Sequence, residues 1–242
     1  MLRVDSLTKC FDSGAAVSAV SFEVSKGEVV GFLGKNGAGK STTMRMICGV
    51  LDPDAGDARL QGRSILTDRH QAQRLIGYLP EGAPLYQDMN PLDYLAFLGA
   101  CHGLARHALR HAMDRAIADT RIGDVAHRRV ASLSKGYRRR VALAGALLTD
   151  PPFLLLDEPM DGLDPVQKQA MRALIRRMSA EKGILISTHT LEDVATMCSR
   201  ALIIDEGRLI ADLTPEDLAR KHPEGLEAAF IELISTPQAG RS

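Results

Sequence analysis

The stretch that decides the fold of this 242-residue chain is Gly34-Lys35-Asn36-Gly37-Ala38-Gly39-Lys40-Ser41. An apolar run from Glu28 to Leu33 precedes it and predicts a strand, and a helix is expected to begin near Gly39. A glycine-rich stretch between a strand and a helix is typical of a loop whose backbone N–H groups turn toward phosphate oxygens. The alternative is a glycine-rich turn with a chance lysine, and the flanking strand and helix disfavour it.

The same pattern assigns roles to single side chains. Lys40 is expected to reach the β- and γ-phosphates, the Ser41 hydroxyl to bind Mg²⁺, and Thr42 to lie near the α- and β-phosphates. The N-terminus of the helix adds partial positive charge. The predicted nucleotide contacts in this loop are Gly34, Lys35, Asn36, Gly37, Ala38, Gly39, Lys40, Ser41 and Thr42.

The pattern of elements changes along the chain. Strands dominate up to about residue 79, whereas residues 82–148 carry helical signals. Asn90-Pro91 predicts a helix start, because asparagine caps a helix well and proline fits its first position. Further helices are expected at 106–120 and 134–148. Strands and helices then alternate between residues 153 and 205, which indicates a largely parallel sheet covered by helices.

One predicted strand, Phe153-Leu154-Leu155-Leu156-Asp157-Glu158, ends in two carboxylates. A buried strand can hold Asp157 rigidly where it meets Mg²⁺, and Glu158 can orient or deprotonate an attacking water. An apolar run followed by two acids is weak evidence alone, because many strands end in solvated acids. The phosphate-binding loop upstream strengthens the interpretation.

A second motif, Leu133-Ser134-Lys135-Gly136-Tyr137, opens a helix 23 residues before Asp157, counted from Ser134. With it the chain resembles the ABC ATPase family, whose signature is Leu-Ser-Gly-Gly-Gln; Lys135 and Tyr137 depart from it. The resemblance implies that Ser134, Lys135 and Gly136 bind the γ-phosphate held by a second subunit, and Lys135 adds positive charge there. Taken alone, the pentapeptide could equally be an ordinary capped helix start.

Other family elements follow in the expected order. The resemblance implies that Phe11 stacks on adenine (the alternative is a core aromatic), that residues 161–164 touch the partner subunit, and that His189 contacts the γ-phosphate. Glu81 stands where the family usually has a glutamine that approaches Mg²⁺ and the lytic water. Residues 76–86 resemble the ATPases of ABC-2-type exporters. The predicted catalytic residues are Glu158, His189, Lys40 and Glu81, and the predicted Mg²⁺ ligands are Ser41, Asp157 and Glu81.

The resemblance implies an α/β fold: a RecA-like P-loop NTPase core with an N-terminal antiparallel β subdomain and an inserted α-helical subdomain. We expect the ATPase domain at residues 1–210, the helical subdomain at about 82–148, and a C-terminal helical tail at 211–242. From Leu226 to Ile234 the tail places apolar residues on one stripe, which predicts an amphipathic helix. That helix could close onto its own core or serve a partner.

The amino-acid composition narrows the possible functional classes of the protein further. Lys plus Arg equals Asp plus Glu at 30 each, and aromatic content is 4% without tryptophan, which argues against nucleic-acid binding. The arginine runs at 128–129 and 138–140 are read as solvated helix faces or interface salt bridges. No apolar run reaches the roughly 20 residues of a bilayer span. Four cysteines without metal spacing are expected to be reduced core thiols in a cytoplasmic protein.

The sequence therefore predicts an ATP-binding and ATP-hydrolysing subunit, using ATP and Mg²⁺, that powers transport, and export is the expected direction. Its expected partners are a second copy of itself in a head-to-tail ATP sandwich and an ABC-2-type permease that holds it at the inner face of the cell membrane. The alternative is a non-transport ABC ATPase acting on ribosome or DNA, whose members usually carry two ATPase units or a coiled-coil insertion. A P-loop kinase or GTPase would leave Leu133–Gly136 and His189 unexplained. No residue in the sequence identifies the transported substrate, and the ATPase motifs do not distinguish import from export.

Overall fold

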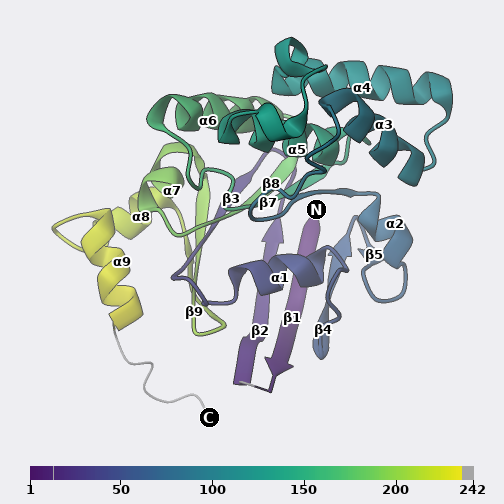
Figure 1. The fold of residues 1–242 in the computed structure, drawn as a ribbon. Helices are drawn as coiled ribbons and strands as arrows, with labels where there is room; N and C mark the ends of the chain where they lie inside the picture. Colours follow the sequence, from purple (N-terminus) through teal and green to yellow (C-terminus); the bar gives the residue numbers. More distant parts are fainter. Residues whose placement is uncertain (13, 236–242) are drawn as a thin grey trace.

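Two β-sheets organise residues 1–12 and 14–235, the part of the chain that the computed structural model describes (Figure 1). The smaller sheet has the strand order β2-β1-β4-β5 and is antiparallel throughout. Its strands are β1 (Leu2–Phe11), β2 (Gly14–Val24), β4 (Ala55–Leu60) and β5 (Arg63–Ser64). It forms the predicted N-terminal antiparallel subdomain.

The larger sheet has the order β10-β9-β3-β8-β7-β6. Its strands from β9 to β6 run parallel, and β10 pairs antiparallel with β9 at the edge. The bounds are β3 (Val29–Leu33), β6 (Ile76–Leu79), β7 (Phe153–Asp157), β8 (Gly183–Thr188), β9 (Arg200–Asp205) and β10 (Arg208–Leu213). Because β3, β8, β7 and β6 are parallel neighbours, their carboxyl ends meet at one edge of the sheet.

The central strands are buried on both faces. In β7, Leu154 and Leu156 belong to one hydrophobic cluster, whereas Phe153 and Leu155 belong to another. Successive side chains of a strand point to opposite faces, so an unbroken apolar run is what a sheet covered on both sides requires. This explains why these strands read as continuous apolar runs rather than as alternating ones.

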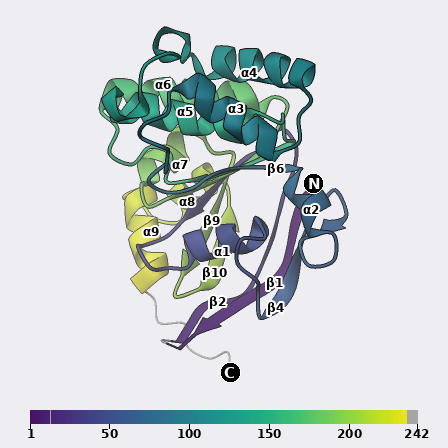
Figure 2. The same ribbon diagram turned by 45° about the vertical axis from the view of Figure 1, so that its right-hand side comes forward.

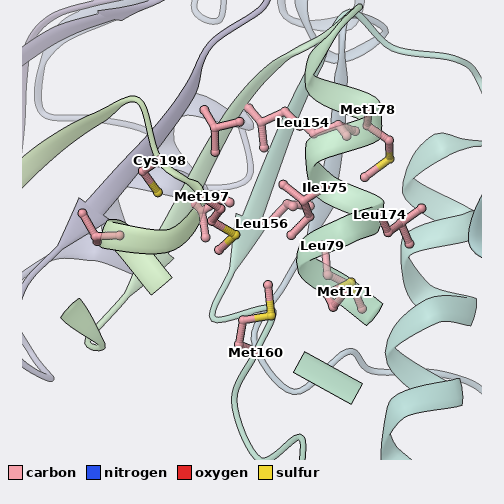
Figure 3. Packing of buried hydrophobic residues seen from close by; sticks show 14 of the residues in the cluster. Leu79, Leu154, Leu156, Met160, Met171, Leu174, Ile175, Met178, Met197 and Cys198 are labelled. Atoms are coloured by element: carbon pink, nitrogen blue, oxygen red, sulfur yellow. The ribbon is translucent and has the colours of Figure 1, made fainter. Parts of the chain in front are cut away.

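Helices cover the two faces of the larger sheet. α1 (Lys40–Ile47) packs between the two sheets, where its buried Met44, Met46 and Ile47 join the cluster that contains Leu155. On the opposite face lie α6 (Pro165–Ser179), α7 (Leu191–Met197), α8 (Pro215–Arg220) and α9 (Leu226–Ser235). Figure 3 shows Ile175 of α6 beside Leu156 of β7, within the hydrophobic cluster that α6 shares with the sheet.

A third layer of helices lies beyond the edge of the sheet and has a hydrophobic core of its own (Figure 2). It consists of α3 (Pro91–Cys101), α4 (Arg106–Thr120) and α5 (Lys135–Leu147), with short 3-10 turns η1 (Gly123–Val125) and η2 (Val130–Ser132). The predicted cap is confirmed, because the Asn90 side chain accepts a hydrogen bond from the Asp93 N–H at 3.0 Å. The predicted fold class is thus confirmed, with the helical layer inserted between β6 and β7.

Some elements differ from expectation. Sequence patterns predicted no strand at β10 and no helix at α2 (Arg69–Gln73), whereas α8 lies within the predicted helical tail. The expected boundary at residue 210 falls inside β10. The apolar stripe of α9 packs on the hydrophobic cluster that also contains residues of α6 and α7, so this helix closes onto its own core. Residues 236–242 of the predicted tail lie outside the described part.

The prediction of four core thiols was half wrong. Cys48 and Cys198 are buried, whereas Cys10 and Cys101 are exposed. Cys10 lies near the end of β1, and Cys101 ends α3, so neither side chain has a neighbouring layer to cover it. All four thiols are free.

Candidate nucleotide-binding site

A pocket of about 460 Å³ opens at the edge where the parallel strands end. The loop after β3, the residues after β6 and β7, and the residue after β8 all contribute to it, because these strands are parallel neighbours in one sheet. Open parallel sheets bind ligands at this edge. The lining residues are Ala16, Asn36, Gly37, Gly39, Lys40, Ser41, Thr42, Glu81, Glu158, Asp161 and His189.

The glycines of the loop are required by close backbone approach. A Cβ at Gly34 would overlap the Ile204 carbonyl oxygen, and one at Gly39 would lie 2.5 Å from the Ala16 carbonyl oxygen. Gly39 also has φ 103°, a left-handed conformation that favours glycine. The turn places the N-terminus of α1 at the pocket. The N–H groups of the first turn of α1 and the helix dipole attract an anion there.

Lys40 lies at the floor of the pocket with its side chain 6% exposed. Its Nζ donates to the carbonyl oxygens of Gly34 at 2.7 Å and Lys35 at 3.0 Å, and lies 3.8 Å from Glu158 Oε1. Burial lowers the pKa of Lys40, and the nearby carboxylates oppose that shift. A phosphate would supply further negative charge to this buried ammonium group.

Asp157 ends β7 and is fully buried. Its Oδ1 accepts hydrogen bonds from Ser41 Oγ at 3.1 Å and from Ser187 Oγ. Its Oδ2 is buried and has no hydrogen-bond partner among the described residues. A buried carboxylate oxygen without a partner is costly, so this atom fits a cation.

The donor set around Asp157 suits Mg²⁺, because hydroxyl and carboxylate oxygens are ligands that this ion prefers. Among the described residues, no group of three or more His, Cys, Asp or Glu side chains is arranged to hold a metal ion. Mg²⁺ commonly takes one or two protein ligands and completes its shell with water and phosphate oxygens. The site therefore fits Mg²⁺ bound together with a nucleotide.

Glu158 follows Asp157 and has a left-handed backbone, with φ 47°. Such a conformation in a non-glycine residue is typical of functional sites, where the surroundings over-determine it. Here the Glu158 N–H donates to Ser187 Oγ at 2.9 Å, and Oε2 lies 3.0 Å from His189 Nδ1. Burial raises the pKa of the Glu158 carboxyl, while His189 and Lys40 pull it back. The arrangement points a carboxylate into the pocket, held by histidine on one side and lysine on the other.

Sequence reasoning missed Ser187. This fully buried side chain joins both acids, because its hydroxyl donates to Asp157 and accepts from the Glu158 N–H. The available signal was a polar residue inside the apolar strand β8, two positions before His189. Only the pairing of β7 with β8 shows which groups it serves, since Asp157 lies opposite Ser187 in the register.

The other predicted site residues lie outside the pocket. Phe11 is 46% exposed, which excludes the core-aromatic alternative, and Lys9 Nζ lies 5.8 Å from its ring centroid. Ser134 caps α5 by accepting from the Tyr137 N–H at 3.4 Å, and neither Ser134 nor Gly136 lines the pocket. The structure thus brings together the loop residues, Glu81, Glu158 and His189, and leaves the signature segment apart from them.

Comparison with known proteins decides the family. Residues 17–161, more than half of the chain, match the family model described as ABC transporter. The chain belongs to the ABC transporter ATP-binding family. This ABC subunit is 37% identical over 209 residues to the uncharacterized ABC transporter ATP-binding protein YxlF of Bacillus subtilis, covering 86% of this chain and 69% of YxlF.

Two further matches support the assignment. The chain is 36% identical to Nod factor export ATP-binding protein I of Ralstonia nicotianae, covering 90% of this chain and 68% of that protein. A solved structure described as the ATP binding subunit of an ABC transporter superposes with a TM-score of 0.85 at 29% identity, covering 96% of this chain and 99% of that one. The predicted recognition and ATPase activity are therefore confirmed: this is an ATP-binding ABC transporter ATPase.

Proposed function

We propose that this ATPase subunit powers export through a separate ABC-2-type permease, and that it works as a head-to-tail dimer enclosing two ATP molecules. The observation that carries the proposal is the convergence of Lys40, Glu158 and His189 on one pocket, with the Ser134 segment outside it. The direction of transport is supported by a relative named as a Nod factor export protein. The predicted resemblance to ABC-2-type exporters points the same way.

Each residue at the pocket has a proposed role in hydrolysis. Lys40 and the N–H groups of α1 neutralise and orient the phosphates, and Ser41 and Asp157 hold Mg²⁺, which supplies charge neutralisation when bound. Glu158 accepts a proton from the attacking water, because its raised pKa makes it a better base than a free carboxylate. His189 holds the Glu158 carboxylate in place. Glu81 lines the same pocket and is proposed to approach the ion and the water.

The dimer follows from the position of the signature segment. Ser134, Lys135 and Gly136 belong to the reaction by family resemblance, yet they do not line their own subunit's pocket. The N-terminus of α5 is well suited to bind a phosphate. A second copy arranged head to tail would place this helix end over the nucleotide of the first, and Phe11 would contact the adenine.

A mainly apolar groove lies where the helical layer meets β6, and we propose it as the permease dock. Its volume is about 350 Å³, and Tyr78, Tyr94 and Leu98 are among its walls. Val50 on its rim is 69% exposed, an apolar surface that a partner would cover. Pro80 and Pro84 also line the groove, on either side of the segment that carries Glu81 into the nucleotide pocket.

This shared segment offers a path from nucleotide to permease. We propose that residues 82–148 move as the helical subdomain when the Glu81 loop responds to nucleotide, within an ATPase domain of about residues 1–210. Among the described residues no helix is long and apolar enough to cross a membrane. By family resemblance, we propose that the permease holds the subunit at the cytoplasmic face of the membrane.

The proposal is tested with Lys40→Ala and Glu158→Gln. Lys40→Ala is expected to lose ATP affinity, because the phosphate charge would go unpaired. Glu158→Gln should retain ATP and lose hydrolysis by about 10²-fold or more, the scale of removing a positioned base. The control is Glu181→Gln, an exposed acid in the turn after α6.

The dimer is tested by light scattering of Glu158→Gln with saturating ATP and Mg²⁺. A mass twice that of the subunit is expected, and a monomer there would refute the ATP sandwich. For export, inside-out vesicles carrying a candidate ABC-2-type permease should stimulate the parent ATPase. Stimulation that survives a charge placed on the exposed rim of the groove by Val50→Arg would refute the proposed dock.

A further inference from the structure

Asp161 is a carboxylate at a place where negative charge is unfavourable. It lies three residues after Glu158, lines the nucleotide pocket and has a side chain that is 51% exposed. An ATP molecule in this pocket brings several negative charges close to it. Asp161 therefore needs a cationic partner for the pocket to accept a polyphosphate.

Two cations of α5 converge on this aspartate. Lys135 Nζ lies 3.3 Å from Asp161 Oδ2, and Arg139 Nη2 lies 3.9 Å from the same oxygen. Arg139 Nη2 also donates to the Asp161 backbone carbonyl oxygen at 3.3 Å. The two cations are four residues apart, so they share one face of the helix.

The two cations differ in how firmly they are held. The Arg139 side chain is 2% exposed, and it fixes the loop through both the backbone and the carboxylate of Asp161. The Lys135 side chain is 48% exposed, and an exposed ion pair of this kind contributes little free energy. Lys135 can therefore leave while Arg139 continues to neutralise Asp161.

Lys135 is held directly over the loop backbone. A Cβ at Gly162 would overlap Lys135 Nζ, so the ammonium group lies against the residue after Asp161. This lysine stands in the signature segment, at the N-terminal end of α5, where the family motif has glycine. The additional positive charge, on Lys135, is thus paired with Asp161 of the same subunit.

We propose that Asp161 is a positioning residue that holds Lys135 in the free subunit and releases it to the γ-phosphate bound by the partner when the ATP sandwich closes. The inference rests on the proposed dimer. Breaking the Lys135–Asp161 pair is part of the cost of closure, and Arg139 keeps the loop in place during the exchange. The pair therefore sets the ATP concentration at which two subunits close.

The test uses the Glu158→Gln background, in which ATP is retained, and measures by light scattering the ATP concentration that gives half-maximal dimer. Adding Asp161→Asn should lower that concentration about two- to fivefold, the range of an exposed ion pair. Adding Lys135→Gln should raise it. The control is Asp119→Asn, which breaks the pair with Arg177 at 3.5 Å, also half-exposed but distant from the nucleotide pocket.

The double variant separates the role of Asp161 in holding Lys135 from a direct effect of its carboxylate on ATP binding. In the Lys135→Gln background, Asp161→Asn should give a clearly smaller decrease, because no lysine remains to be released and only the direct effect of the carboxylate on ATP is left. A decrease of equal size with and without Lys135 would overturn the proposal, as would an Asp161→Asn variant that matches Asp119→Asn. If the Glu158→Gln parent stays monomeric at every ATP concentration, the ATP sandwich itself fails and this inference falls with it.

Discussion

Replacing Ser187 by alanine tests whether one hydroxyl supports both acids of the nucleotide pocket. The change removes a hydrogen bond to the Asp157 carboxylate and leaves the Glu158 N–H without its acceptor. A hydrogen bond to a charged group contributes about 1.5–3 kcal/mol and a neutral one about 0.5–1.5 kcal/mol. Since Ser187 is fully buried, water cannot replace it easily, and we expect the free energy of unfolding to fall by about 2–4 kcal/mol.

The same variant should slow hydrolysis. Ser187 helps to hold Glu158 in its left-handed backbone conformation, and a loosened Glu158 would displace the carboxylate that meets the attacking water. Misplacement by about 1 Å can cost 10²-fold in rate, so we expect kcat to fall by about 10- to 10²-fold. The KM for ATP should change less, because Lys40 and the α1 N-terminus are untouched.

Urea unfolding and steady-state ATPase assays measure the two effects. The control is Ser199→Ala, which removes a single hydrogen bond, from Ser199 Oγ to the Val29 carbonyl oxygen at 3.0 Å, at an exposed position. It should lose only about 1 kcal/mol and retain kcat. If Ser187→Ala is as stable and as active as Ser199→Ala, the hydroxyl does not support the two acids.

Three other predictions concern exposure, charge and coupling. In the native protein, a thiol reagent should modify Cys10 and Cys101 and spare the two buried cysteines; modification of all four would contradict the packing. Because the folded state raises the pKa of Glu158, its ionised form destabilises the fold, so Glu158→Gln should be more stable than the parent at pH 7. That advantage should shrink as pH falls through the raised pKa and vanish below about pH 4.5, the ordinary glutamate value, and melts that show no pH dependence would refute it. Glu81→Gln should retain most ATPase activity and Glu81→Ala should lose more, together with permease stimulation; parent-like behaviour of Glu81→Ala would remove this residue from the site.

The sequence by itself determined the fold class and the identity of the nucleotide loop. The function of Gly34–Ser41 can be recognised from the local sequence, because phosphate binding needs glycines, a lysine and a hydroxyl at fixed spacing along the chain. The helix start at Asn90-Pro91 and the buried strand ending at Asp157 were likewise readable, since caps and apolar runs are local signals. These features depend on residues a few positions apart.

Tertiary structure alone decided how distant residues meet. Ser187 reaches Asp157 only because β7 and β8 pair in one register, and Lys135 reaches Asp161 only because α5 packs beside the loop after β7. Whether α9 closes onto the core or serves a partner was open in the sequence, because an amphipathic stripe does not name the surface that covers it. The physical reason is common to all three: hydrogen bonds, ion pairs and burial act over a few ångströms in space, whereas sequence patterns report only spacing along the chain.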